Sequence, residues 1–201
     1  MSGGAYDPAC DVDHNGTIDI FDIQLTAGHW GQTGTYNVYP AMVPKTGQTT
    51  PFAIGDDGHL QKGVTWPDPR FTDNANGTVT DNLTGLIWLK NADCFGLKVW
   101  ATALSYANTL NNGECGLTDG SVEGDWRLPN VREMLSLVDY DRTGPALPSG
   151  HPFTGVSGSY WTSTSYAANV ANAWYMAMNT NAVGGHDKSN TLHVWPVRGG
   201  Q

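Results

Sequence analysis

Residues 71–89, Phe-Thr-Asp-Asn-Ala-Asn-Gly-Thr-Val-Thr-Asp-Asn-Leu-Thr-Gly-Leu-Ile-Trp-Leu, predict short β-strands joined by tight turns. Asn76-Gly77 lies between alternating residues, and an Asn-Gly pair in that setting is the strongest short-range signal of a hairpin. A second turn signal, Leu83-Thr84-Gly85, comes directly before the apolar run 86–89. The stretch therefore predicts a small antiparallel sheet at the start of a domain.

Two helices and a second group of strands are predicted downstream. Apolar residues recur at helical spacing over residues 100–110, and Asn111-Asn112-Gly113 ends that helix. Asn130 is a natural N-cap, and Glu133 three residues later completes a capping box, so a second helix begins there. Strands are predicted in three later segments, residues 159–163, 173–178 and 192–197, with polar loops between them. The order of strands, two helices and strands predicts the α+β class.

The amino-acid composition argues against a nucleic-acid partner and against a membrane span. The 201 residues include 25 Gly, 8 Trp and 8 Tyr but only 14% charged residues, which is typical of a loop-rich domain that contains β-structure. Nineteen acidic against ten basic residues give a net charge of −9. Because phosphate binding needs clustered basic residues, no nucleic-acid partner is expected. No run approaches the roughly 20 apolar residues that a membrane span requires, so no span is expected.

Residues 11–22, Asp-Val-Asp-His-Asn-Gly-Thr-Ile-Asp-Ile-Phe-Asp, have the spacing of a calcium-binding loop. Gly16 stands at the sixth position, where such a loop turns sharply. Calcium takes six to eight oxygen ligands, and this spacing wraps one segment around it, so Ca²⁺ is the predicted cofactor. The predicted ligands, with Thr17 acting through its backbone carbonyl, are Asp11, Asp13, Asn15, Thr17, Asp19 and Asp22.

The calcium loop resembles the repeat of dockerin modules. It ends in Asp22 rather than the Glu of an EF-hand, and an apolar helical pattern follows at once. Dockerins normally carry two such repeats, whereas residues 1–34 contain one. We therefore expect a dockerin-like calcium-binding module over 1–34 that staples the N-terminal segment; assembly through this repeat is the alternative.

Four separated motifs resemble a large bacterial family that also forms the C-terminal domain of a collagen-like adhesin. They occur in order as 71–88, Asp125-Trp-Arg-Leu-Pro-Asn130, Tyr160-Trp-Thr-Ser-Thr-Ser165 and Pro196-Val-Arg-Gly-Gly200. The resemblance implies a C-type lectin-like fold over residues 40–201, with two helices, small twisted antiparallel sheets, and paired first and last strands. Members of the family serve mainly as secreted or cell-surface binding modules, so a ligand-binding role is expected.

The segment from Ser165 to Trp195 resembles the variable region of lectin-like proteins that retroelements diversify. Asn recurs there among small residues, although ordinary loop composition explains the same pattern. Trp195 stands where the family usually has Arg, and an exposed aromatic side chain offers a large contact area. Trp161 and Trp174 are expected to be buried framework residues. The residues predicted to project together toward a protein or carbohydrate ligand are Tyr166, Ala168, Asn169, Asn172, Asn181, His186, Asp187, His193 and Trp195.

The cysteines bear on location and on the enzyme alternative. Cys94 and Cys115 bracket a helix-sized segment and form a disulfide if the environment oxidises, which leaves Cys10 over. Formylglycine-generating oxidases share the lectin-like fold but use a cysteine pair late in the chain, where this sequence has none. No enzymatic activity is therefore expected.

The first residues lack the regions of a signal peptide, yet a calcium loop suits the millimolar calcium outside cells, so a secreted or cell-surface protein is expected.

Overall fold

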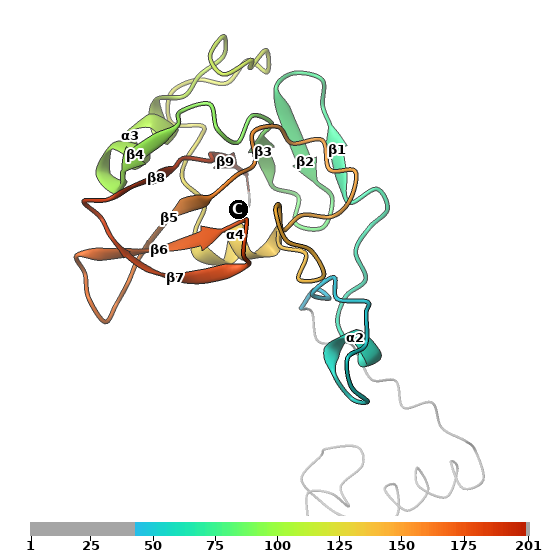
Figure 1. The fold of residues 1–201 in the computed structure, drawn as a ribbon. Coiled ribbons are helices and arrows are strands. Elements are labelled where there is room, and N and C mark those ends of the chain that lie inside the picture. Colours follow the sequence, from blue (N-terminus) through green and yellow to red (C-terminus); the bar gives the residue numbers. More distant parts are fainter. Residues whose placement is uncertain (1–42, 200–201) are drawn as a thin grey trace, which may run out of the picture. The chain divides into compact units, whose positions relative to one another are not determined.

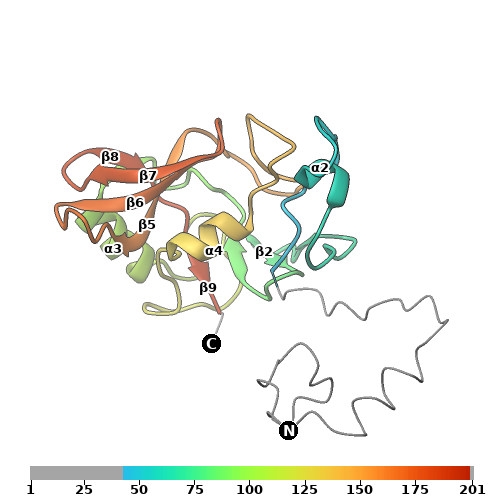
Figure 2. The same cartoon turned by 90° about the horizontal axis from the view of Figure 1, so that it is seen from below.

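The computed structural model describes residues 43–199. Contacts within the chain divide it after Tyr39, and the unit that begins at Pro40 is described by itself. The predicted calcium loop at residues 11–22, and the rest of the module predicted at 1–34, lie outside the described residues. Figures 1 and 2 show the described unit as a mixed α and β domain with two sheets, which agrees with the predicted α+β, C-type lectin-like fold.

The first sheet forms from the stretch that begins the domain. Its four strands, in spatial order and all antiparallel, are β1 (Phe71–Asp73), β2 (Thr78–Asp81), β3 (Ile87–Leu89) and β9 (Val197–Arg198). The β1–β2 turn contains the predicted Asn76-Gly77 pair. Gly77 has a φ of 84°, and a Cβ there would lie 2.4 Å from the carbonyl oxygen of Gly116, so only glycine fits. The hairpin prediction is confirmed.

The second sheet has five strands. In spatial order they are β4 (Leu97–Val99), β8 (Thr191–His193), β5 (Ser159–Ser165), β6 (Asn172–Ala177) and β7 (Ala182–Asp187). Strands β5 and β8 pair parallel and the other neighbours pair antiparallel. Two sequence expectations were wrong here. The segment 182–187 was expected to be a loop and is β7, and the strand expected at 192–197 is split between β8 and β9, one in each sheet.

The two predicted helices lie on opposite faces of the second sheet. Helix α3 (Trp100–Thr109) packs Ala103 and Ala107 into the cluster that contains Trp161. Helix α4 (Val131–Ser136) packs Met134 into the cluster that contains Tyr160. Because neighbouring residues of a strand point to opposite faces, these two clusters are on opposite sides of β5. Figure 2 shows α4 between the second sheet and β2.

The start of α4 follows the sequence signal. The Asn130 side chain accepts hydrogen bonds from the backbone N–H groups of Arg132 and Glu133, and the Glu133 carboxylate accepts one from the backbone N–H of Asn130. This is the predicted capping box. A further single-turn helix, α2 (Asp57–Leu60), begins after Asp56 in the segment that precedes the first sheet.

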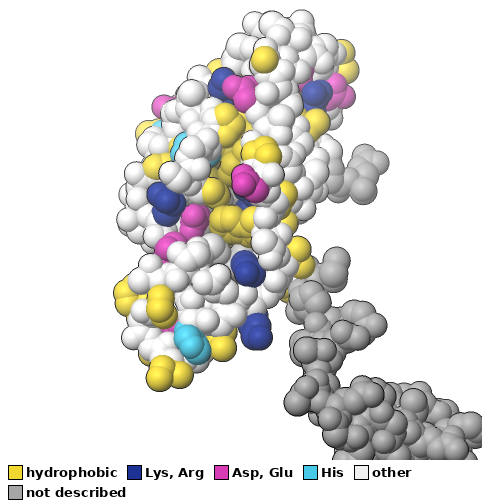
Figure 3. All heavy atoms as spheres, turned by 90° about the vertical axis from the view of Figure 1, so that its right-hand side faces the viewer, with side chains coloured by type: hydrophobic (Ala, Val, Ile, Leu, Met, Phe, Trp, Pro, Cys, Tyr) yellow, Lys and Arg dark blue, Asp and Glu magenta, His cyan; other side chains and the backbone are white. Residues whose placement is uncertain are grey.

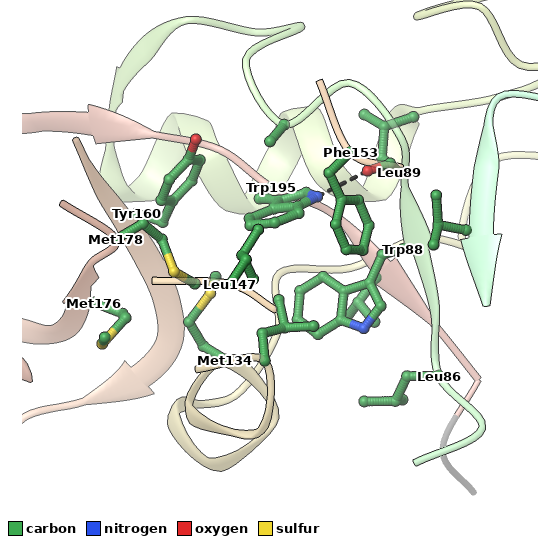
Figure 4. Close-up of a cluster of buried hydrophobic side chains, with 14 of the residues drawn as sticks. Leu86, Trp88, Leu89, Met134, Leu147, Phe153, Tyr160, Met176, Met178 and Trp195 are labelled. Atoms are coloured by element: carbon green, nitrogen blue, oxygen red, sulfur yellow. Dashed lines mark hydrogen bonds between the residues drawn. The ribbon is translucent and has the colours of Figure 1, made fainter. Parts of the chain in front are cut away.

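Trp195 occupies the centre of the larger core cluster and has no exposed surface. Its indole Nε1–H donates a 2.8 Å hydrogen bond to the Leu89 carbonyl, and its ring meets those of Trp88, Phe153 and Tyr160 at centroid distances of 5.5, 4.9 and 5.2 Å (Figure 4). The prediction of an outward-facing Trp195 is therefore wrong. The chain passes from β8 in one sheet to β9 in the other, and Trp195 lies on this crossing inside the domain.

A buried ion pair joins the first sheet to the end of α4. Arg70 Nε and Nη2 bond the two carboxylate oxygens of Asp81 at 2.8 and 3.0 Å, and Nη2 also donates to the Ser136 carbonyl at 2.7 Å. The guanidinium lies 4.8 Å from the ring centroid of Trp66 and 4.9 Å from that of Phe71. Since Asp81 is fully buried, each charge depends on the other for its compensation.

Cys94 and Cys115 form a disulfide with their Cα atoms 5.7 Å apart. Both residues pack against the larger core cluster, so the bridge holds the segment that contains α3 to that core. Within residues 43–199, no helix is long and apolar enough to cross a membrane.

Candidate ligand-binding surface

The loop between β5 and β6 is folded by its own hydrogen bonds. The Tyr166 N–H donates to the Asn172 carbonyl at 3.0 Å, and the Asn169 N–H donates to the Tyr166 carbonyl at 3.0 Å. The Asn172 N–H in turn donates to the Asn169 carbonyl at 2.9 Å. These bonds tie the backbone of the loop together and leave the side chains of Ala168 and Val170 exposed.

Lys188 fastens this loop to the end of β7. Its ammonium donates to the Ser165 hydroxyl at 2.8 Å and to the Val170 carbonyl at 3.0 Å, and it lies 4.0 Å from the ring centroid of Trp100. Its backbone N–H donates to the Ala171 carbonyl at 2.9 Å. The sequence did not predict this role, because nothing about a single Lys in a polar segment indicates a hydrogen bond to a loop residue 18 positions earlier.

A pair of aromatic rings lies beside the loop. Tyr166 meets Trp174 edge to face, with ring centroids 4.9 Å apart. A Cβ at Gly185 would lie 3.0 Å from the Tyr166 ring, so the glycine lets the ring lie against β7. Trp174 was predicted to be buried, and it is partly exposed instead. Its neighbour across the strand pair is Gly185, which has no side chain to cover the indole.

Two further predicted residues complete this end of the sheet. In the β6–β7 register Asp187 lies opposite Asn172 and His186 opposite Ala173, and both side chains are exposed. The Ser189 hydroxyl and backbone N–H bond the Asp187 carboxylate at 2.7 and 2.8 Å and lower its pKa. Asp187 is therefore an anion at neutral pH.

The structure places six of the nine predicted residues at this end of the sheet. His186, however, points to the opposite face of β7 from Asp187 and lies near Trp161 and Tyr175, so the prediction that these two side chains project together is wrong. We call the region that the six residues form with Trp174 the loop end of β5–β7; its residues are Tyr166, Ala168, Asn169, Asn172, Trp174, His186 and Asp187. The other three predicted residues lie elsewhere. Trp195 is in the core, and Asn181 lies in the β6–β7 turn, where its amide donates to the Arg142 carbonyl at 2.8 Å. His193 lies in β8 and its Nδ1 is 2.7 Å from an Asp93 carboxylate oxygen.

Arg142, whose carbonyl accepts from Asn181, is one of the residues that line a hollow of about 440 Å³ in the segment 141–151. His151 lines this hollow, and burial lowers the pKa of its imidazole. His193 pairs with Asp93 rather than with His151, His186 or Asp187. Over residues 43–199 no group of three or more His, Cys, Asp or Glu side chains is placed to hold a metal.

One side of the domain is shown in Figure 3, the side that carries β1 in Figure 1. Basic and acidic side chains are interspersed there among hydrophobic ones, with no extended field of one sign. This face therefore lacks the basic patch that a nucleic-acid backbone needs.

Comparison with known protein families adds a decisive match. The model of the Lcl C-terminal domain family matches residues 77–198 of the chain. The chain belongs to this family. The match runs from the first turn of the domain to β9 and includes the whole loop end of β5–β7. Membership identifies a C-type lectin-like, ligand-binding variable-protein domain. No curated protein matches the chain.

Proposed function

We propose that this Lcl C-terminal domain recognises its ligand, as an adhesin or receptor-like module, at the loop end of β5–β7. The observation that carries the proposal is the combination of exposed side chains with a fixed backbone. The loop 166–172 closes on its own hydrogen bonds, and Lys188 ties it to β7. A surface that is ordered before binding loses little conformational entropy when the ligand arrives.

The chemistry of the loop end suits a protein or a carbohydrate ligand. Tyr166 and Trp174 offer partly exposed aromatic area, which supports binding at low entropic cost. The amides of Asn169 and Asn172 donate and accept hydrogen bonds, and Asp187 adds a negative charge. We propose binding rather than catalysis, because these groups recognise and orient a ligand without forming an activated nucleophile.

We further propose that the loop end is open to sequence diversification, in line with the resemblance to retroelement-diversified proteins. None of its residues belongs to either core cluster, so substitutions there leave the packing of the two core clusters unchanged. A reverse-transcriptase gene and a near-identical template repeat in the surrounding genome are expected. Their absence from a complete genome would contradict this proposal and leave ligand binding untouched.

The binding surface is tested by changing several of its residues at once. Ala168→Glu, His186→Ala and Asp187→Asn together are expected to leave the free energy of unfolding nearly unchanged. The same variant is expected to lose the signals that the full chain gives on an array of immobilised glycans and extracellular protein domains. The matched control carries Ala101→Glu, Ser105→Ala and Asn108→Ala at exposed positions of α3. This control variant should keep the array signals. Unfolding of the loop-end variant, or unchanged binding, would refute the assignment.

The N-terminal segment is proposed to bind one Ca²⁺, on the strength of its sequence spacing alone. Titration calorimetry of the full chain with calcium should give one site, because the carboxylates of residues 11–22 repel one another without a cation. Asp13→Ala should abolish it, whereas Asp7→Ala, an acidic residue outside the loop, should leave it intact. A chain that takes up no calcium at millimolar concentration would contradict the proposal.

A secreted or cell-surface location is proposed with it. A disulfide between Cys94 and Cys115 persists in an oxidising compartment, and calcium is abundant outside cells. In such a setting the calcium loop staples the N-terminal segment, and the lectin-like domain faces its ligand.

A further inference from the structure

Strand β7 forms one edge of the second sheet. Within residues 43–199 its strand partner is β6, which lies beside it in Figure 1. The two strands stay in register over all six residues of β7. Every side chain of β7 except the position of Gly184 is exposed. Edge strands are usually protected by Lys, Pro or a bulge, and residues 182–187 contain none of these.

The hydrogen-bond pattern shows which backbone groups point away from the sheet. Lys188 lies opposite Ala171, and its N–H donates to the Ala171 carbonyl, so this is a hydrogen-bonded pair. In an antiparallel ladder such pairs alternate with non-bonded ones. His186, Gly184 and Ala182 therefore bond to β6. The N–H groups of Val183, Gly185 and Asp187 and the C=O groups of Val183 and Gly185 point to the free edge, whereas the Asp187 C=O already accepts a hydrogen bond from the Asn190 N–H at 3.0 Å.

The sequence of β7 is self-complementary in size and charge. Its first half is small and uncharged, Ala182-Val183-Gly184, and the residues after Gly185 are larger and polar, His186-Asp187-Lys188. An antiparallel copy centred on Gly185 places each residue of one half opposite a residue of the other. His186 then faces Gly184, Asp187 faces Val183, and Lys188 faces Ala182, so no like charges meet across the strands.

We propose that two copies of the chain pair through β7, antiparallel and centred on Gly185, and so join their second sheets into one. The Gly185 N–H and C=O then bond Gly185 of the other copy, the Asp187 N–H bonds the Val183 C=O, and the Val183 N–H shares the Asp187 C=O with Asn190, which covers the exposed edge. The pairing uses backbone groups, while side chains stand on the two faces of the sheet. It therefore places His186 and Asp187 of the loop end beside the other copy, while the loop 166–172 of each copy lies at one end of the paired strands, and it goes beyond the binding function proposed above.

Cysteine cross-linking tests the register in the full chain carrying Cys10→Ser. In the proposed pair, residue 183 of one copy faces residue 187 of the other at a Cα separation of about 5.5 Å, which a disulfide spans. Within one strand the same residues are about 13 Å apart and cannot be bridged. Val183→Cys/Asp187→Cys is therefore expected to form covalent dimers on mild oxidation, while each single variant stays monomeric. Dimers from a single variant, or none from the double variant, would overturn this register.

Sedimentation velocity tests the pairing in proteins that carry no introduced cysteine. Val183→Pro removes an N–H that points to the free edge and leaves the ladder with β6 intact. Because the two-fold axis removes this bond twice, the dimer dissociation constant should rise about tenfold or more. Val183→Ala, which keeps the N–H, should change it little. Circular dichroism checks that both variants fold. The proposal would be overturned by a wild-type chain that stays monomeric at its highest soluble concentration. It would also be overturned if β7 paired with a strand of another protein and not with a second copy of this chain.

Discussion

Replacing Trp195 with alanine should lower the free energy of unfolding by about 4 kcal/mol. The indole is fully buried among Trp88, Phe153 and Tyr160 and donates to the Leu89 carbonyl, so alanine leaves both a cavity and an unpaired acceptor. Urea unfolding followed by circular dichroism measures the change.

Trp174→Ala is the matched control for size and chemistry. Its indole is partly exposed at the loop end, and the same truncation should cost about 1–2 kcal/mol because less apolar surface leaves contact. The two variants also separate stability from recognition, since only Trp174→Ala is expected to weaken ligand binding in a folded protein. Equal destabilisation by the two truncations would contradict the core position of Trp195.

Asp81→Ala is expected to destabilise the domain by about 3–5 kcal/mol, because it leaves the Arg70 guanidinium buried without a counter-charge. The substitution also removes the acceptor for the Leu83 N–H and the Thr84 hydroxyl, which bond the Asp81 carboxylate at 3.0 and 2.7 Å. Urea unfolding is again the measurement.

Two comparisons isolate the burial of the charge. Asp73→Ala breaks the Asp73–Lys90 pair, which is about one-third exposed on both sides, and should destabilise the domain far less than Asp81→Ala. Arg70→Met combined with Asp81→Leu removes both charges and should recover much of the loss, since no uncompensated ion remains. A double variant as unstable as Asp81→Ala would show that the hydrogen bonds of Asp81, rather than its charge, dominate.

Local sequence signals predicted the parts of the fold that depend on neighbouring residues. The Asn76-Gly77 hairpin and the Asn130–Glu133 capping box each form from residues within a few positions of one another. The helix predicted over 100–110 is likewise present as α3, because its apolar spacing matches one buried face. Such elements carry their own turn or cap chemistry, so the sequence alone reveals them.

The misplaced elements depend on contacts between distant residues. Strand β7 has Gly184-Gly185 at its centre, which gives a low strand propensity, and it forms because β6 offers a full ladder of partners. The apolar run 192–197 has the pattern of one strand, but its beginning belongs to β8 in the second sheet and its end to β9 in the first sheet. Trp195 lies between these two strands in the core. Periodicity does not show which sheet a residue joins.

The loop end was partly predictable for a similar reason. Asn-rich, small-residue composition marked the segments 166–172 and 186–187 as exposed, and the structure brings them together. The Lys188 contacts with the loop, and the absence of a side chain at Gly185 that exposes Trp174, arise only when β6 and β7 pair. Asn181 was included for its residue type, although the turn uses its amide to hold Arg142.

The crossing from β8 to β9 has a consequence for how fast the domain folds. The hydrogen bond that seats Trp195 joins it to Leu89 across 106 residues, and β9 closes the first sheet beside β3. The transition state must therefore close a long loop before the central indole contributes, a high contact order that slows folding. Until residues 195–198 arrive, β3 remains an unpaired edge and the larger core stays open. Intermediates that lack this last step are the ones most prone to aggregate.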